Sequence, residues 1–307
     1  DSKSPPAEKL QLGDIVVIDM QDIGVRSYTY ISTIYKVMKE CAKAGKPVMI
    51  LDRPNPLGGI SVDGNILEEG MSSFVGIVPV TYIHGLTVGE LAVMINEEGW
   101  LSDPGTETLK CRLNVIEMQS WKRWMNWEDT GLQWFPTSPH VPDIASVRGI
   151  AALGILGELG IISIGIGTTL PFQYFGSPYF STADFEKYFD IHNVSGIKFI
   201  EARYRPFYGM YSGRDCSGFL LKFRPNNLYA PYSTSIRILY ALRQMDPGLF
   251  SNTNITSKQK NMFQKVTGSK EIINSLIEGK SYDEIMVLAQ KGLGEFLQFR
   301  QKYLLYE

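Results

Sequence analysis

Two apolar runs of the sequence, at residues 15–20 and 48–51, each lead into an aspartate and then an arginine. The polar side chains after the first run are Asp22 and Arg26, and those after the second are Asp52, Arg53 and Asn55. Carboxylates move protons and arginines bind anionic groups, so each set is suited to hold and transform a polar ligand. An aspartate after a strand also often caps a turn or helix, and for one loop alone we would prefer that explanation. Because two neighbouring loops share the pattern, we predict a site.

These residues require a scaffold that brings both loops to one place, and the surrounding sequence predicts a parallel sheet. Short apolar runs that open into Gly/Pro loops are typical of buried parallel strands, whose carboxyl ends are where such sheets bind ligands. The helical spacing of apolar residues at 27–44 predicts a crossover helix between the first two strands. We expect strands at 15–20, 48–52, 74–80, 111–116 and 161–166, and helices at 27–44, 87–98 and 144–159.

The pattern changes after about residue 182. Strands are expected at 197–205 and 219–224, followed by helices at 232–244, 259–267, 270–278 and 282–298. We therefore predict an α/β fold with a doubly wound parallel sheet in residues 1–185, followed by a smaller α+β domain in residues 186–307.

The composition is that of a globular protein and excludes several classes of function. The chain has 307 residues, of which 44% are hydrophobic and 20% charged, and its net charge is −2. We therefore expect no nucleic-acid partner, and no apolar segment is long enough to span a membrane. The three cysteines and three histidines are scattered, so we expect no disulfide framework, no metal site and no cofactor. The glycine turn at 165–169 lacks the lysine and the spacing that nucleotide binding requires.

A histidine and a glutamate flank the start of the helix expected at 87–98. His84 precedes the helix N-terminus beside Gly85, where it would donate a proton or a hydrogen bond to a ligand. Hydrogen bonds to the backbone would explain this histidine equally well. Glu90 follows Thr87 by three residues, which is the spacing of a capping box, and we predict a structural role for Glu90.

Three further candidates lie in the middle of the chain. Trp134 and Ser138 belong to a proline-rich loop, in which the tryptophan would either stack against a sugar or anchor the loop to the core. Glu158 lies in an apolar, glycine-rich run. Apolar surroundings raise the pKa of a carboxyl group, which suits a general acid, whereas a solvated helix end would give Glu158 no such property.

Several blocks of the sequence together resemble one protein family. The blocks are QDIGVRSYTYIST, LDRPNPLGG, SFVGIVPV, HGLTVGELA, TGLQWFPTSP, GTTLPF and RQKYLLYE. In this order, from about residue 10 to residue 307, they resemble the NamZ-type exo-β-N-acetylmuramidase family. The resemblance implies a Rossmann-like domain with a smaller auxiliary domain, and release of N-acetylmuramic acid from the non-reducing ends of peptidoglycan glycans. It also implies a periplasmic or exported bacterial protein, although the opening residues DSKSPPAEKL do not have the pattern of a signal peptide.

Two departures from the family pattern bear on activity. The family's Pro-Glu-His-Gly motif, whose glutamate is a candidate catalyst, does not occur in this sequence. Glu158 is retained, but Ile164, Ile166 and Leu170 stand where the family has a glutamate and two arginines. Arginines are natural partners for the lactyl carboxylate of muramic acid, so their replacement implies either a different sugar or a loss of activity.

Two main hypotheses follow. The first is a glycoside hydrolase acting on peptidoglycan-derived amino sugars, with two carboxyl groups, or with one and the substrate's own acetamido group. Its assigned roles are catalysis for Glu158, Asp52 and His84, support for Asp22, carboxylate binding for Arg26 and Arg53, and sugar contacts for Asn55, Trp134 and Ser138. The second is a glycan-binding relative without catalysis, a pseudoenzyme. A nucleotide-dependent enzyme rests on fold analogy alone and ranks last. No particular oligomeric state is predicted.

Overall fold

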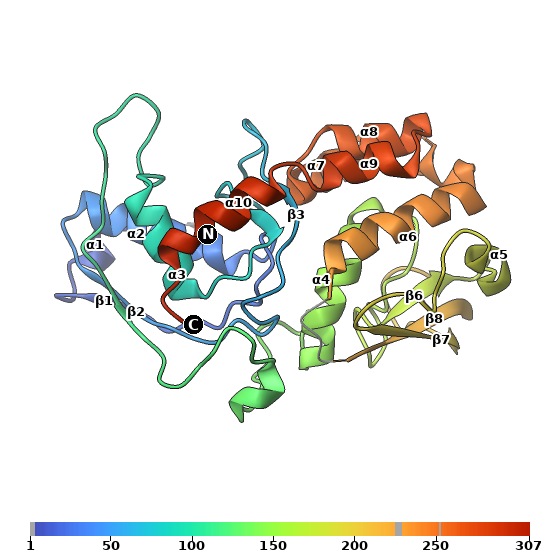
Figure 1. Ribbon diagram of the computed structural model, residues 1–307, viewed down its shortest axis with the longest axis horizontal. Coiled ribbons are helices and arrows are strands. Elements are labelled where there is room, and N and C mark those ends of the chain that lie inside the picture. The colour runs from blue at the N-terminus through green and yellow to red at the C-terminus, as the bar shows by residue number, and fades with distance from the viewer. Residues whose placement is uncertain (1–3, 225–228, 252) are drawn as a thin grey trace.

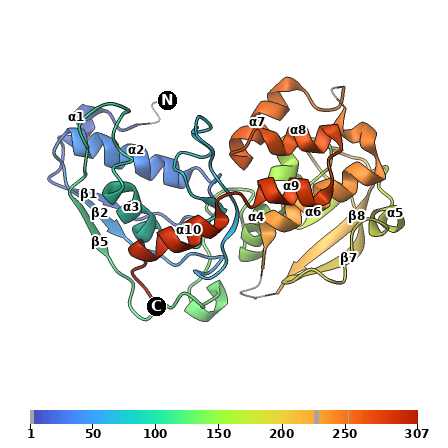
Figure 2. The same ribbon diagram turned by 45° about the horizontal axis from the view of Figure 1, so that its top comes forward.

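The computed structural model describes residues 4–224, 229–251 and 253–307, which form two lobes side by side (Figure 1). The first lobe is built on a parallel sheet in the order β1-β2-β5. Its strands are β1 (Val16–Ile18), β2 (Val48–Leu51) and β5 (Leu113–Ile116), and its main helices are α2 (Tyr30–Lys43), α3 (Val88–Glu97) and α10 (Leu293–Phe299). Apolar side chains of these helices and strands share one core, so the helices and the sheet stabilise each other. Figure 2 shows α2, α3 and α10 beside the sheet in this lobe.

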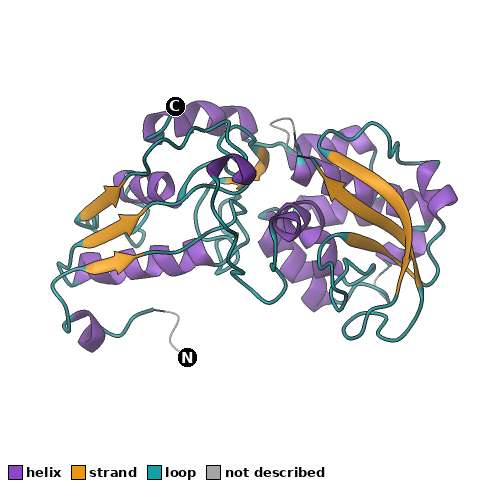
Figure 3. Ribbon diagram, turned by 90° about the horizontal axis from the view of Figure 1, so that it is seen from below, coloured by secondary structure: helices purple, strands orange, loops and turns teal. Residues whose placement is uncertain are grey.

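The two faces of this sheet differ in burial. Ile18 and Ile50 point into the core and are buried, whereas Val17 and Ile116 are 52% and 45% exposed. Seen from below, the three strands lie in front of the helices (Figure 3). Within the described residues, the helices therefore cover one face of the sheet, although parallel sheets are commonly covered on both.

Local sequence explains where the helices of this lobe begin and end. Helix α2 has the apolar spacing expected at 27–44, and Gly45 takes a φ of 64°, which stops the helix. Helix α3 begins at a complete capping box between Thr87 and Glu90. The structural role predicted for Glu90 is therefore confirmed.

The second lobe is an antiparallel sheet packed against helices. The sheet order is β6-β8-β7, and the strands are β6 (Tyr174–Ser177), β7 (Ile197–Tyr204) and β8 (Cys216–Phe223). The helices are α4 (Ile144–Leu159), α5 (Thr182–Glu186), α6 (Pro231–Met245), α7 (Ser257–Thr267), α8 (Glu271–Glu278) and α9 (Tyr282–Ala289). Helix α4 packs against α6 and α7, and the aromatic rings of Phe175 and Phe219 stack in the core of the lobe.

Short elements join the lobes and complete the chain. An antiparallel ribbon of β3 (Asp63–Ile66) and β4 (Thr81–Ile83) lies between the lobes, and the C-terminal segment returns from the second lobe to the first through α10. The remaining elements are α1 (Ala7–Leu10) and the 3₁₀ turns η1 (Trp127–Thr130), η2 (Pro247–Phe250) and η3 (Arg300–Tyr303). No helix within the described ranges is long and apolar enough to cross a membrane.

Several expected elements differ in the structure. The strands expected at 74–80 and 161–166 are wrong, because these segments form only isolated bridges, Ser73 with Gly76 and Ser163 with Gly176. The helix expected at 282–298 is two helices, since Gly292 takes a φ of 79° between α9 and α10. Strands β3, β4 and β6 were not expected from the sequence.

The predicted boundary between the two domains, at residues 185/186, stays a prediction. Side-chain packing divides the chain earlier, because α4 and β6 precede that boundary and contribute to the core of the second lobe. The predicted α/β class with a parallel sheet is confirmed.

Candidate functional site

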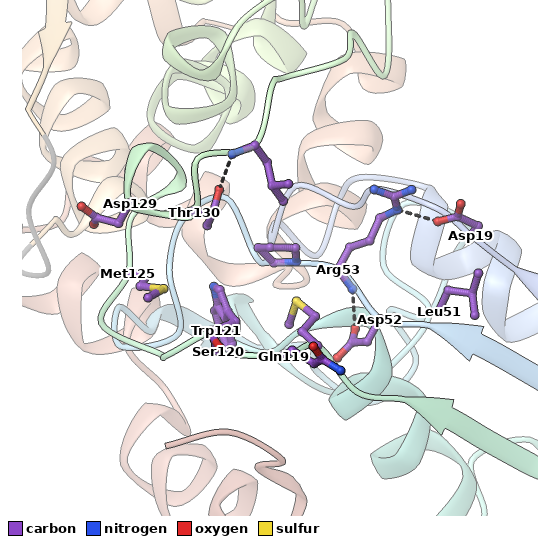
Figure 4. Close-up of a pocket in the computed structure, with 13 residues that line it drawn as sticks. Asp19, Leu51, Asp52, Arg53, Gln119, Ser120, Trp121, Met125, Asp129 and Thr130 are labelled. Carbon is purple, nitrogen blue, oxygen red and sulfur yellow. Dashed lines mark hydrogen bonds and ion pairs between the residues drawn. The ribbon is translucent and has the colours of Figure 1, made fainter.

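The carboxyl ends of the three parallel strands meet at one edge, and a pocket of about 460 Å³ opens there. We call it the main pocket. Figure 4 shows its lining, which comes from the loops after β1, β2 and β5 and from the segment around η1. Its lining residues are Asp19, Leu51, Asp52, Arg53, Pro54, Met118, Gln119, Ser120, Trp121, Met125, Asp129, Thr130 and Leu132. The predicted position of the site, outside the carboxyl ends of the strands, is where this pocket lies.

Arg53 and Asp19 form the rim of the main pocket. The Nε of Arg53 donates to Asp19 Oδ1 at 2.5 Å, and this hydrogen bond holds the pKa of the Asp19 carboxyl below its usual value (Figure 4). The Arg53 side chain is 41% exposed, and no hydrogen bond joins its two terminal amino groups to the rest of the described chain. These groups are therefore free to bind an anionic ligand in a bidentate manner.

A second cavity of about 400 Å³, the side pocket, shares Asp19 and Arg53 with the main pocket. Phe135, which is 72% exposed, lines the side pocket together with Thr137. The two cavities thus form a groove on either side of the Arg53–Asp19 pair, with an aromatic ring at one end that suits contact with a sugar face.

Asp52 lines the main pocket, but its carboxylate is fully engaged by the protein. Oδ1 accepts from the backbone N–H of Gly89 at 2.7 Å and of Arg53 at 2.9 Å. Oδ2 accepts from the hydroxyls of Thr87 and Tyr306, both at 2.7 Å. Four donors occupy the acceptor positions of both oxygens, which gives Asp52 a structural role, and its predicted catalytic role stays a prediction. The side chain fastens β2 to α3 and to the C-terminal segment.

His84, Asp22 and Asn55 come together, but beneath the pocket surface rather than in it. Asn55 is buried, its Nδ2 donates to the carbonyl of Leu86 at 3.0 Å, and its Oδ1 accepts from a neighbouring backbone N–H. Burial, with positive charge from Arg300 and Arg26, lowers the pKa of His84 to about 3. The imidazole does not line the main pocket, and the predicted catalytic role of His84 stays a prediction.

Asp22 is the most strongly perturbed carboxyl of this cluster. The side chain is buried, and desolvation raises its pKa to about 7, against the opposing effect of the hydrogen bond from the Gly24 backbone N–H at 2.8 Å. Asp22 therefore carries a proton in part of the molecules at neutral pH, as its burial without a cationic partner requires.

Arg26 has a structural role instead of the predicted contact with a substrate carboxylate. Its side chain is 0% exposed. Nη1 donates to the carbonyls of Asn65 and Val80 at 2.7 and 2.6 Å, and Nη2 donates to the carbonyl of Thr267 at 2.6 Å. Burial lowers its pKa to about 10, so Arg26 remains charged and joins the β3–β4 ribbon to the end of α7.

The proline-rich loop is anchored through Trp134, as one of the two predictions for this residue stated. Its Nε1 donates to the carbonyl of Val141 at 3.2 Å, and its ring packs edge-to-face on Trp127 with centroids 5.1 Å apart. Ser138 lies in the same loop, where its carbonyl accepts from the Val141 N–H at 2.9 Å. Neither residue lines the main pocket or the side pocket, whereas the neighbouring Phe135 lines the side pocket.

Glu158 lies on α4 in the second lobe and does not line the main pocket with Asp52. Burial raises the pKa of its carboxyl, and within the described ranges no hydrogen bond or ion pair engages this group. Its charge interacts with the hydroxyl of Tyr82, which also raises the pKa of that tyrosine. Ile164 packs against Gly157, the residue before Glu158 on α4, because a Cβ at Gly157 would lie 2.5 Å from Ile164 Cδ1.

Several residues of the site were missed by the sequence analysis. Arg123 forms a buried ion pair with Glu90 at 2.6 Å, and Arg123 and Arg300 both donate to the carbonyls of Gly59 and Gly85. Tyr306 reaches Asp52 from the far end of the chain. The partners of Arg300 and Tyr306 lie more than 200 positions away in the sequence, so no local sequence pattern predicts these contacts. Among the described residues, no group of three or more His, Cys, Asp or Glu side chains is placed to hold a metal ion.

The fold and the groove define a two-lobed α/β protein with a pocket at the carboxyl edge of a parallel sheet. Two family models match it, described as the N-terminal part of the exo-β-N-acetylmuramidase NamZ, over residues 1–145, and the C-terminal part, over residues 151–306. The chain therefore belongs to the NamZ exo-β-N-acetylmuramidase family, which confirms the predicted resemblance.

Known relatives agree with this membership. The chain is 33% identical over 305 residues to the peptidoglycan β-N-acetylmuramidase NamZ of Bacillus subtilis, covering 99% of this chain and 70% of that protein. It is also similar to two crystal structures of DUF1343 family proteins from Bacteroides fragilis. The first has a TM-score of 0.91 at 35% identity and the second a TM-score of 0.75 at 26% identity, each covering 99% of this chain and 78% of the other.

Proposed function

We propose that this protein is a glycosidase of peptidoglycan that releases N-acetylmuramic acid from the non-reducing ends of glycan fragments. The observation that carries the proposal is the position of Arg53, whose free terminal amino groups lie between the main pocket and the side pocket. The lactyl carboxylate distinguishes muramic acid from glucosamine, and a partly exposed arginine at the rim is a matching partner for it. The name of the Bacillus subtilis relative points to the same substrate class.

In this proposal Glu158 is the general acid. Burial raises the pKa of its carboxyl, which keeps the group protonated closer to neutral pH than a solvated glutamate. Glu158 lies on α4, outside the lining of the main pocket, so this role requires a substrate that extends from the groove towards α4. The second catalytic group is then either another carboxyl group of the protein or the acetamido oxygen of the substrate.

The alternative proposal is a glycan-binding protein without catalysis. Two observations support it: the Asp52 carboxylate accepts four hydrogen bonds from the protein, and Glu158 does not line the main pocket. The groove and Arg53 serve binding equally well in this case. For either activity we propose a periplasmic or exported location, because the substrate is part of the cell envelope.

The test is release of sugar from the disaccharide MurNAc-GlcNAc and from a chromogenic MurNAc glycoside. Release that is lost in Glu158→Gln but kept in Glu186→Gln, an exposed control on α5, supports the hydrolase with Glu158 as its acid. Absence of release together with saturable binding in calorimetry supports the binding protein. If Arg53→Gln binds muramic acid as tightly as the parent does, the assignment of Arg53 is wrong.

A further inference from the structure

A small cavity of about 10 Å³ lies beneath the groove, between the loop after β1, the loop after β2 and the segment before α3. We call it the polar cavity. Three of its lining side chains each direct one buried polar atom that has no hydrogen-bond partner in the described chain. These atoms are Gln21 Oε1, Asp22 Oδ1 and His84 Nε2. Buried polar groups without partners are rare, and three in a single cavity indicate a bound molecule that satisfies them together.

The other polar atoms of these side chains form hydrogen bonds within the protein. Those bonds show whether each atom without a partner is a hydrogen-bond donor or an acceptor. Leu86 N–H donates to His84 Nδ1 at 3.2 Å, so the neutral ring carries its proton on Nε2, which is a donor. Gln21 Nε2 donates to the carbonyls of Asp22 and Pro54 at 2.8 and 2.9 Å, which leaves Oε1 as an acceptor. Asp22 Oδ2 accepts from Gly24, and Oδ1 is an acceptor when ionised and a donor when protonated.

We propose that the polar cavity is a binding site for one water molecule. A water accepts from His84 Nε2–H and donates to Gln21 Oε1, and its remaining hydrogen or lone pair serves Asp22 Oδ1 in either protonation state. The cavity volume is about that needed for one water, and three polar partners is the usual number for a buried one. A metal ion does not fit, because a protonated Nε2 has no lone pair to offer it.

The water adds a shared contact among three segments, of which the loop after β1 and the segment before α3 are already joined by the Val25–Ile83 bridge. Gln21 links it to the loop of Arg53 through the bond to Pro54, Asp22 links it to the turn after β1, and His84 links it to the residues that precede α3. A water bridge of this kind is nearly as favourable as direct hydrogen bonds. In this proposal the water adds hydrogen bonds that support the floor of the groove.

A crystal structure of the protein at a resolution that shows ordered solvent tests the proposal. We expect one density peak at hydrogen-bond distances, roughly 2.6–3.2 Å, from all three atoms. An empty cavity overturns the proposal, and so does a peak at the roughly 2.0–2.4 Å typical of a metal–oxygen bond.

Two variants at one position sharpen the test. Asp22→Asn keeps a polar group in the cavity and is expected to keep the water, whereas Asp22→Val removes it and is expected to lose the density peak. A peak that survives in Asp22→Val with unchanged position contradicts the assignment of Asp22. Should Asp22→Val fail to fold, NMR of the parent decides: the proposal expects a proton on His84 Nε2 with a cross-peak to a long-lived water. A proton on Nδ1, or no water cross-peak, refutes it.

Discussion

The raised pKa of Asp22 predicts a specific effect of pH on the free energy of unfolding. Its pKa is near 3.9 in an unfolded chain and about 7 in the folded protein, because the carboxyl is buried without a cationic partner. Between these two values the folded state binds the proton and the unfolded state does not. The stabilising contribution of protonated Asp22 to the free energy of unfolding is therefore complete below about pH 4, and it is lost as the pH rises to about 7.

The size of the effect follows from the two pKa values. They differ by about 3, and a difference of one pKa unit corresponds to about 1.36 kcal/mol, so the ionised Asp22 costs on the order of 4 kcal/mol. Asp22→Asn removes the charge and keeps an oxygen for the Gly24 hydrogen bond. The stability of the variant relative to the parent should therefore rise by that amount between about pH 4 and pH 8.

Urea unfolding of parent and variant at a series of pH values measures this difference. His84, whose folded pKa is lowered to about 3, contributes a slope of the opposite sign below about pH 6.5, because the unfolded state binds its proton first. Both proteins keep His84, and since the two groups line one cavity, only the part of this slope that is independent of the Asp22 charge cancels in the comparison. Asp14→Asn, at an exposed position, is the matched control and should follow the parent. A difference between Asp22→Asn and the parent that does not change with pH would refute the reasoning.

Three further predictions concern the groove and its support. Tyr306→Phe should lower the free energy of unfolding by about 2 kcal/mol, because its hydroxyl donates to the buried Asp52 carboxylate; an unchanged urea midpoint would contradict this. Gly89→Ala should lower the thermal midpoint by several degrees, since a Cβ there would lie 2.7 Å from the Asp52 carboxylate, whereas Gly294→Ala meets nothing within 4 Å and should be neutral or stabilising. Arg53→Gln should weaken the affinity for muramic acid, measured by calorimetry, roughly 10-fold or more, because it removes a charge-assisted hydrogen bond. The affinity for glucosamine should change little. Equal losses of affinity for both sugars would count against recognition of the carboxylate.

The parts of the fold that follow from local sequence were predicted well. Strands β1 and β2, helices α2 and α3, and the capping box between Thr87 and Glu90 depend on apolar spacing and helix signals within a few residues. The edge that carries the site also follows, because any parallel sheet brings the carboxyl ends of its strands together.

Individual roles could not be predicted, because they depend on contacts far apart in the sequence. The Asp52 carboxylate accepts a hydrogen bond from Tyr306, a partner 254 residues away, and Arg26 donates to the carbonyl of Thr267. The apolar run at 161–166 has the composition of a strand, yet its backbone finds a sheet partner only at Ser163. Composition cannot indicate whether a neighbouring strand is present to pair with it.

The most direct test of the proposed function is the liberation of free N-acetylmuramic acid from MurNAc-GlcNAc by the protein. The account predicts release that falls sharply in Glu158→Gln, persists in Glu186→Gln, and is absent with a disaccharide that has N-acetylglucosamine at its non-reducing end. Release of N-acetylglucosamine from that second disaccharide at an equal rate, or release unaffected by Glu158→Gln, would contradict the account.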